Sequence, residues 1–348
     1  MSKEEIKRRR LENQHLLQKA DTRTVVRDLC GVQAQFLSHA LHGLSLRADA
    51  DTSHLVKSWT LRGTLHLFDE EDLPLFLHEG RTRFLRPQDT MDTDAWIGKE
   101  KKSYFSHVIL DAIGSGRESR DELKCICREK GMTESEETSL FDPWGGIIRA
   151  LCEQGRICHR VSQEKAYCLC PEFTPMDRDT AKLELVRRYF THFGPATVKD
   201  AAYFLGWTQR EVRQQLSLLD TASFQLGDET FYHIPRAVPD CNFPSVLFLA
   251  GFDQLMLGYE KTQSLFLPPE HLRDIFTRSG IVRPALLVNG TVAGHWNLKN
   301  GKLIITLFRI EDTAMVKREA LTLWPQLKKI EILENSPGIV ICYPHKRQ

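Results

Sequence analysis

Two glutamines near the N-terminus, Gln33 and Gln35, are the residues whose types and spacing could do chemistry. Side chains two residues apart diverge on a helix but share one face of an extended segment. Gly31 ends one helical pattern and Phe36 begins the next, so we expect both amides side by side in an extended entry to that helix. A glutamine amide does not titrate, but it donates and accepts hydrogen bonds and can hold a water molecule. The alternative is two exposed or capping glutamines.

A second polar group lies in the run 61–68, which alternates apolar and polar residues. A strand with this period places Arg62, Thr64 and His66 on one face. Arg62 could then hold a DNA phosphate, Thr64 could bind the same phosphate, and His66 could reach a base or a sugar. The alternative is an amphipathic strand whose polar side faces water.

Positive charge is clustered, although the net charge is only +1. Binding to nucleic acid requires a local positive stripe rather than a large total charge. The clusters are Lys7–Arg10, the group Arg81, Arg83 and Arg86, and Arg187–Arg188. We expect the middle group to contact DNA.

The composition argues against several other classes of protein. The nine cysteines are irregularly spaced and lack the C-x2-C pattern of zinc ribbons, so we expect reduced thiols, no metal and no cofactor. Phosphate-loop, zincin, serine-hydrolase and dinucleotide-binding motifs are missing from the sequence. The charged N-terminus does not resemble a signal peptide, and no apolar run is long enough to span a membrane. These features predict a cytoplasmic protein.

The chain repeats one pattern three times, namely short helices followed by a two-stranded ribbon, which is typical of winged helix-turn-helix domains. The third copy is the clearest, because Thr197 and Thr208 are expected to cap successive helices before a hairpin at 224–233. In the first copy, 52–58 reads as a short helix. We predict an α+β fold with winged-helix domains at 1–105, 106–175 and 176–238.

The remaining part of the chain, 239–348, is predicted to be a β-rich, barrel-like domain. An apolar run at 245–250 precedes a meander with turns at Asn289-Gly290 and Asn300-Gly301. A helix at 314–323 is expected to end before Pro325. Asp253 follows the apolar run, and an aspartate in such a turn is more often structural than catalytic.

Several motifs in register resemble those of the AlkZ-like DNA glycosylases. They are Cys30–Gln35, Leu46-Arg47, Trp59–Leu67, Gly194–Thr197, Phe252–Tyr259 and Val292–Trp296. The resemblance implies three winged-helix domains around a DNA channel and a Gln-aliphatic-Gln catalytic motif, here Gln33 and Gln35. It also implies a C-terminal hairpin at the lesion, for which Asn289 is our candidate, with His295 as a further DNA contact. In this chain Phe252-Asp253-Gln254 replaces a more acidic sequence at that motif.

The resemblance implies monofunctional hydrolysis of the N-glycosidic bond of N7-alkylated purines, including bulky adducts and interstrand crosslinks, which leaves an abasic site. Such purines are cationic and leave without protonation, so a positioned water supplies much of what the reaction lacks. The expected partner is damaged double-stranded DNA, bound by a monomer associated with the bacterial nucleoid. The alternative is a non-catalytic winged-helix DNA-binding protein or regulator.

Overall fold

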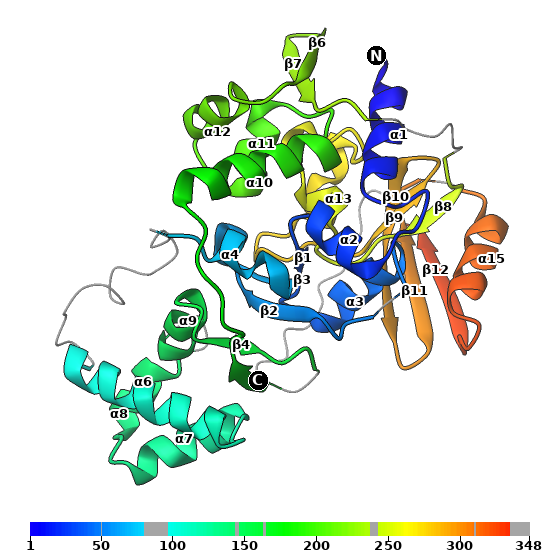
Figure 1. Cartoon of the computed structure of the whole chain (residues 1–348). Coiled ribbons are helices and arrows are strands. Elements are labelled where there is room, and N and C mark those ends of the chain that lie inside the picture. The colour runs from blue at the N-terminus through cyan, green and yellow to red at the C-terminus, as the bar shows by residue number, and fades with distance from the viewer. Residues whose placement is uncertain are drawn as a thin grey trace.

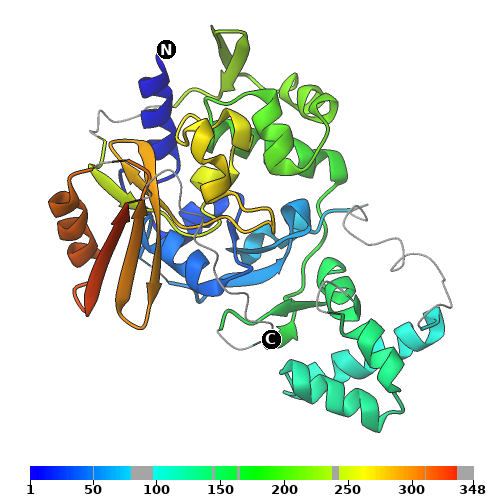
Figure 2. The ribbon, with the colours of Figure 1, turned by 180° about the vertical axis from the view of Figure 1, so that it is seen from behind.

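The computed structural model describes residues 1–49, 51–79, 97–142, 146–162, 165–236, 243–309 and 311–334. Helices and sheets are mixed along the chain, as the sequence predicts (Figure 1). A group of helices lies at one end of the molecule and a five-stranded sheet lies at the other (Figure 2). Within the described residues, no helix is long and apolar enough to cross a membrane.

The central sheet joins two parts of the chain. Its strands are β1 (Val32–Gln33), β2 (Leu55–Trp59), β3 (Leu65–Asp69), β4 (Ile157–His159) and β5 (Tyr167–Leu169). Their order is β1-β3-β2-β4-β5. The ribbons expected separately from the first and second copies therefore form one sheet. The helix predicted at 52–58 is wrong, since β2 takes most of that segment and its residues Val56 and Ser58 turn a buried face to the core.

Helices before and after β1 position that strand. They are α1 (Lys3–Asn13), α2 (Thr22–Asp28), α3 (Leu37–Ser45) and the short α4 (Leu73–Phe76). Asp21 caps α2 by accepting from the backbone N–H of Thr24. Cys30 and Gly31 both take left-handed backbone conformations, with φ of 53° and 83°, and turn the chain from α2 into β1. A Cβ at Gly31 would lie 3.1 Å from the carbonyl oxygen of Leu67, so the close approach of the two chains also favours glycine at this position.

The helices at one end of the molecule form a unit with a hydrophobic core of its own. They are α6 (Lys99–Gly114), α7 (Arg120–Glu129), α8 (Glu134–Leu140) and α9 (Gly146–Glu153). Ser119 and Thr133 begin α7 and α8 with capping boxes, which satisfy free backbone N–H groups in the first turn. The two-stranded ribbon expected at the end of this copy of the repeat is confirmed by the pairing of β4 with β5.

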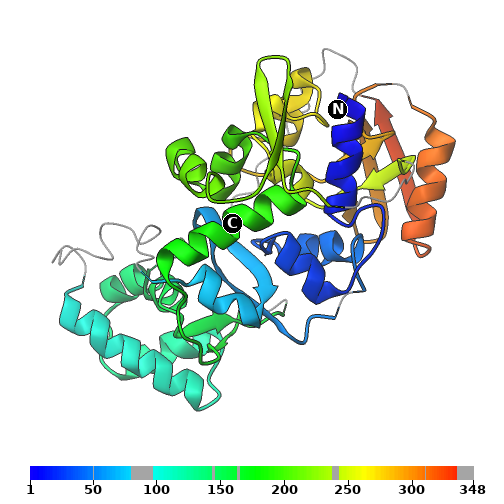
Figure 3. The same cartoon turned by 45° about the horizontal axis from the view of Figure 1, so that its top comes forward.

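The third copy of the repeat has the predicted order of elements. It contains α10 (Arg178–His192), α11 (Val198–Leu205), α12 (Gln209–Leu216) and the hairpin β6–β7 (Ala222–Leu226, Glu229–His233). Thr197 and Thr208 cap α11 and α12 with capping boxes. Figure 3 shows α10 between this unit and the N-terminal helices, and its side chains share the main core with them.

The C-terminal sheet is open rather than barrel-like. Its strands are β8 (Val246–Phe248), β9 (Ala285–Val288), β10 (Thr291–Lys299), β11 (Lys302–Leu307) and β12 (Lys329–Glu334), in the order β12-β11-β10-β9-β8. The meander and its two turns are confirmed. Within the described residues the edge strands β8 and β12 do not pair with each other, so the sheet does not close. β12 pairs with β11 in parallel, and α15 (Thr313–Leu323) packs on one face of the sheet (Figure 1).

Candidate active site

Gln33 and Gln35 lie side by side, and their side chains are joined. Gln33 is on β1 and is 5% exposed, whereas Gln35 lies in the exposed turn before α3. The side-chain nitrogen Nε2 of Gln33 donates to Oε1 of Gln35 over 2.9 Å. The extended backbone expected from the sequence therefore brings both amides together at the N-terminal end of α3.

Arg62 fixes the orientation of this pair. Its Nη2 donates to Oε1 of Gln33 over 3.2 Å, and its Nη1 donates to the carbonyl oxygen of Phe204 near the C-terminal end of α11. A cation at that end of a helix also interacts favourably with the unpaired carbonyl groups. Burial lowers the pKa of the Arg62 guanidinium to about 10, so it stays charged at neutral pH.

The backbone around Arg62 differs from the predicted strand. Leu61–Gly63 forms a 3-10 turn, and β3 begins only at Leu65. Arg62 and Gly63 both have left-handed conformations, with φ of 56° and 66°. The prediction of one polar face running through 62, 64 and 66 is therefore wrong, because the turn directs Arg62 toward Gln33 and α11.

His66 and Thr64 serve the same turn. His66 pairs directly with Gln33 across β1 and β3 and is fully buried. Its Nδ1 lies 2.8 Å from Oγ1 of Thr60, in a hydrogen bond, and the hydroxyl of Thr64 donates to the carbonyl oxygen of Leu61 over 3.1 Å. Both side chains stabilise the turn that carries Arg62.

A buried ion pair lies behind the glutamines. The two Nη atoms of Arg47 lie 3.0 and 2.7 Å from the two carboxylate oxygens of Asp253, and both side chains are almost fully buried. Asp253 also caps α13 (Gln254–Leu257), and Gln254 donates to the carbonyl oxygen of Gly31. Asp253 is structural, as expected. The sequence did not predict the contact between Gln254 and Gly31. The one signal for it is that Gln254 is a polar residue within an otherwise apolar run.

One arginine of the N-terminal basic cluster, Arg10, and one of the α10 cluster, Arg188, make internal contacts. Arg10 donates to the carbonyl oxygen of Pro195 over 2.9 Å and stacks on the Tyr259 ring, 3.7 Å from its centroid. Arg188 binds both carboxylate oxygens of Asp72, at 2.6 and 2.8 Å. These guanidinium groups are therefore committed to the core of the protein.

Two of the remaining predicted DNA contacts, Asn289 and His295, lie on or next to the β9–β10 hairpin of the C-terminal sheet. Asn289 is exposed in the β9–β10 turn with a φ of 48°. His295 is partly buried beside Phe308, and burial lowers its pKa to about 4, so it is neutral at physiological pH. Arg81, Arg83 and Arg86 lie outside the described residues.

One group within the described part of the chain has the composition of a metal site, namely His15, Asp28 and His192. Oδ2 of Asp28 lies 2.7 Å from Nε2 of His15 and 3.2 Å from Nδ1 of His192. Arg236 lies 3.3 Å from the same His192 nitrogen, and burial lowers the pKa of His192 to about 4. Hydrogen bonds and ion pairs thus account for the group.

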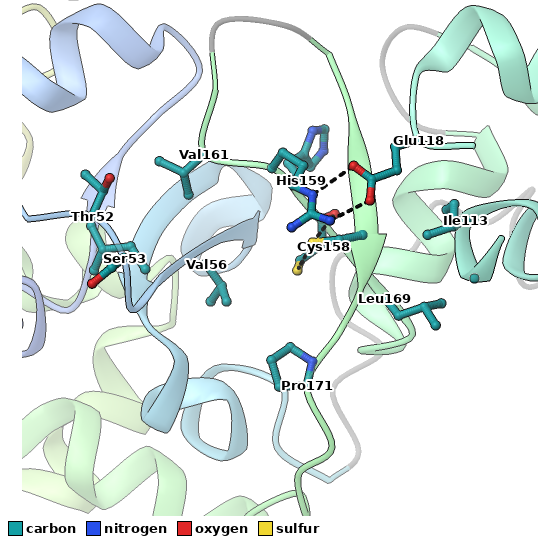
Figure 4. Close-up of a pocket in the computed structure, with 14 residues that line it drawn as sticks. Thr52, Ser53, Val56, Ile113, Glu118, Cys158, His159, Val161, Leu169 and Pro171 are labelled. Carbon is teal, nitrogen blue, oxygen red and sulfur yellow. Dashed lines mark hydrogen bonds and ion pairs between the residues drawn. The ribbon is translucent and has the colours of Figure 1, made fainter. Parts of the chain in front are cut away.

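A hollow of about 590 Å³ lies where β4 and β5 meet β2 and α6 (Figure 4). Arg160 binds Glu118 with two hydrogen bonds at its rim. The thiols of Cys158 and Cys168 lie 3.4 Å apart in its wall, and hydrogen bonding to a neighbouring thiol, followed by burial, raises the pKa of both. Such thiols are poor nucleophiles, which leaves the glutamine pair as the better candidate for chemistry.

A glutamine pair held by a partly buried arginine thus lies beside α11, in a unit of three helices and a hairpin. The chain belongs to the AlkZ-like DNA glycosylases, because the family model described as "DNA glycosylase AlkZ-like" matches residues 26–322. The predicted family and enzyme class are thereby confirmed.

Two comparisons with proteins of Streptomyces sahachiroi agree with this family. The chain is 24% identical over 327 residues to a protein named "Interstrand DNA cross-link repair glycosylase", covering 84% of this chain and 86% of that protein. The solved structure of the DNA glycosylase AlkZ superposes with a TM-score of 0.76 at 21% identity, covering 96% of this chain and all of that one. The second comparison shows a shared fold.

Proposed function

We propose that this enzyme is a monofunctional glycosylase for N7-alkylated purines in double-stranded DNA, including bulky adducts and interstrand crosslinks. The observation that carries the proposal is the pair of hydrogen bonds in which Arg62 donates to Gln33 and Gln33 donates to Gln35. The crosslink substrate is supported by the Streptomyces relative, an interstrand DNA cross-link repair glycosylase.

In the proposed reaction, the bond between N9 of the alkylated purine and C1′ of the sugar breaks, and its electron pair goes to the purine. The purine is already cationic and so leaves as a neutral base. A water held between the amides of Gln33 and Gln35 adds its oxygen to C1′ and releases a proton to solvent, which leaves an abasic site. Neither amide takes the proton permanently, since the pair acts by positioning and by stabilising charge.

DNA is proposed to lie across three winged-helix domains, at 1–105, 106–175 and 176–238, with 239–348 as a C-terminal domain. The capped helices and hairpin of α10–α12 and β6–β7 support this arrangement for the third domain. Arg81, Arg83, Arg86, Asn289 and His295 remain proposed DNA contacts, and the enzyme is proposed to act as a monomer on the bacterial nucleoid.

The test is a single-turnover assay on a duplex with one N7-methylguanine, comparing wild type, Gln33→Ala and Gln35→Ala. Alkali-sensitive cleavage that both variants lose would support the proposal. Gln263→Ala is a matched control, because Gln263 is an exposed glutamine outside the three proposed winged-helix domains. The same proteins are then assayed for unhooking of a nitrogen-mustard crosslink. Wild type without activity on either DNA would contradict the proposal and leave a non-catalytic DNA-binding protein.

A further inference from the structure

An exposed aromatic ring lies directly beside the candidate catalytic pair. Phe36 follows Gln35, and its side chain is 49% exposed. It is the N-cap residue of α3 and makes no side-chain hydrogen bond to that helix. N-cap positions favour Ser, Thr, Asp and Asn, whose side chains accept from free backbone N–H groups. A phenylalanine there forgoes helix stability and exposes apolar surface, and such breaks of local preference are expected at functional sites.

The ring of Phe36 rests on other rings. It stacks on Phe252, with centroids 5.7 Å apart and an angle of 22° between the planes. The edge of His39 approaches it with centroids 6.1 Å apart. We call Phe36, His39 and Phe252 the aromatic shelf. Because Phe252 is buried and Phe36 is half exposed, the shelf presents one ring to solvent with a second ring beneath it.

The shelf is built on a strained and firmly held backbone. Phe252 has a φ of 59°, which is rare for a bulky residue. Its N–H donates to the carbonyl oxygen of Val282 over 3.1 Å, and the next residue is Asp253, in the buried pair with Arg47. Strain of this kind persists only where surrounding contacts impose it, and it is concentrated at functional sites.

We propose that the aromatic shelf binds an unstacked nucleobase next to the damaged nucleotide, with its face against the ring of Phe36. This inference rests on the proposed function. Phe36 has an extended backbone, so its ring lies off the face that carries the two amides, while adjacent Cα atoms are about 3.8 Å apart and successive nucleotides rise about 3.4 Å. A sugar at Gln35 therefore leaves a neighbouring base, and not the damaged one, for the ring of Phe36. Aromatic rings bind bases of any sequence by stacking, because every base has a π face. The occupant is therefore a base that lost its pairing or stacking when the lesion entered the site.

The experiment uses a duplex in which 2-aminopurine lies directly next to an uncleavable abasic analogue on the same strand, with the fully paired duplex as a second ligand. Phe36→Ser removes the ring and supplies a better N-cap, while Phe36→Trp keeps a stacking surface. For Phe36→Ser we expect the dissociation constant for the first duplex to rise about 5- to 150-fold, with loss of 2-aminopurine quenching. Binding to the paired duplex should change less than about 3-fold, and Phe36→Trp should restore both signals.

Tyr104→Ser is the matched control, because Tyr104 is also 49% exposed but lies on α6. A uniform loss of affinity for both duplexes with Phe36→Ser, or a marked fall in its melting temperature, would overturn the proposal and assign the ring to packing. Binding and quenching are measured on uncleavable DNA, so they are independent of hydrolysis. If quenching depends on Phe36 while no alkylated DNA is cleaved, the proposed glycosylase function fails and the shelf stands.

Discussion

The side-chain nitrogen of Gln33 donates to the side-chain oxygen of Gln35, while the oxygen of Gln33 accepts from Arg62. A guanidinium can only donate, so the Gln33 atom that faces it must be the oxygen. The hydrogen bonds therefore have one direction, from Arg62 to Gln33 to Gln35. This leaves the amino group of Gln35, the second lone pair of its oxygen and the second N–H of Gln33 as the groups that can hold a water between the two amides.

This direction predicts how substitutions of Gln35 will differ. A carboxylate can still accept from Gln33, so Gln35→Glu should retain at least about a tenth of the single-turnover rate. Gln35→Met has a similar length but accepts no strong hydrogen bond, and its rate should fall about 100-fold or more, the usual size of a lost proton-transfer or water-positioning group. The rates are measured on N7-methylguanine DNA. Equal loss in both variants would indicate that the amino group of Gln35 is the essential part.

Arg62 gives a prediction that separates positioning from phosphate binding. In Arg62→Met the apolar stem remains but Gln33 loses its charged donor, so the rate should fall about 10- to 100-fold, the equivalent of one charge-assisted hydrogen bond. The dissociation constant for undamaged DNA should change less than about 3-fold. A phosphate contact would instead weaken binding and reduce the slope of affinity against salt by about 1. Arg187→Met, at a half-exposed arginine paired with Glu184, serves as the control.

Only part of this site can be predicted from the sequence, and the turn at Leu61–Gly63 belongs to the part that cannot. Side by side placement of Gln33 and Gln35 follows from Gly31 and the start of the next helix, because those signals are local. The position of Arg62 does not, because its left-handed conformation is compensated by Gln33 and by the carbonyl oxygen of Phe204, 142 residues later in the chain. Contacts of that separation leave no periodic trace in the sequence.

The same contrast holds for the fold. The caps at Thr197 and Thr208 and the Asn289-Gly290 turn lie in short signatures that fix their elements, and all three agree with the structure. The segment 52–58, predicted as a helix, instead contributes most of the strand Leu55–Trp59, because the pairing partners β3 and β4 decide its conformation rather than its own residues. The open C-terminal sheet depends on the parallel addition of β12, another long-range contact.

The pair Arg47–Asp253 predicts a large loss of stability. Asp253→Ala leaves the Arg47 guanidinium buried without its carboxylate, which should lower the free energy of unfolding by about 3–5 kcal/mol. The matched control is Glu118→Ala, which breaks the more exposed pair with Arg160 and should cost less than about 1 kcal/mol. Denaturant unfolding of both variants measures the difference. Similar losses for the two would show that burial of the Arg47 pair adds nothing.

His159 predicts a pH dependence of stability. Burial, aided by the positive charges of Lys57, Arg120 and Lys165, lowers the pKa of His159 from 6.5 to about 3. Between these values the unfolded chain binds a proton that the folded chain excludes. The free energy of unfolding therefore falls as the pH drops below 6.5, by up to about 1.4 kcal/mol per pH unit from this group.

His159→Phe removes that proton but keeps an aromatic ring between Trp59 and Tyr167. Melting temperatures taken from about pH 7 to about pH 4 should fall less steeply for the variant than for wild type. The slope will not vanish, because burial also lowers the pKa of His192 and His295 to about 4. Parallel curves for the two proteins would contradict the prediction.

The sheet that carries Gln33 has very little backbone pairing between its two parts. On one side β1, β3 and β2 pair over several residues, and on the other β4 pairs with β5, but β2 and β4 share one registered pair, Lys57 and His159. The helices α6–α9 keep their own hydrophobic core beyond this rung. Backbone pairing therefore contributes little to the junction of the two parts, which depends instead on side-chain contacts such as that of the Trp59 ring with His159, 5.1 Å between centroids.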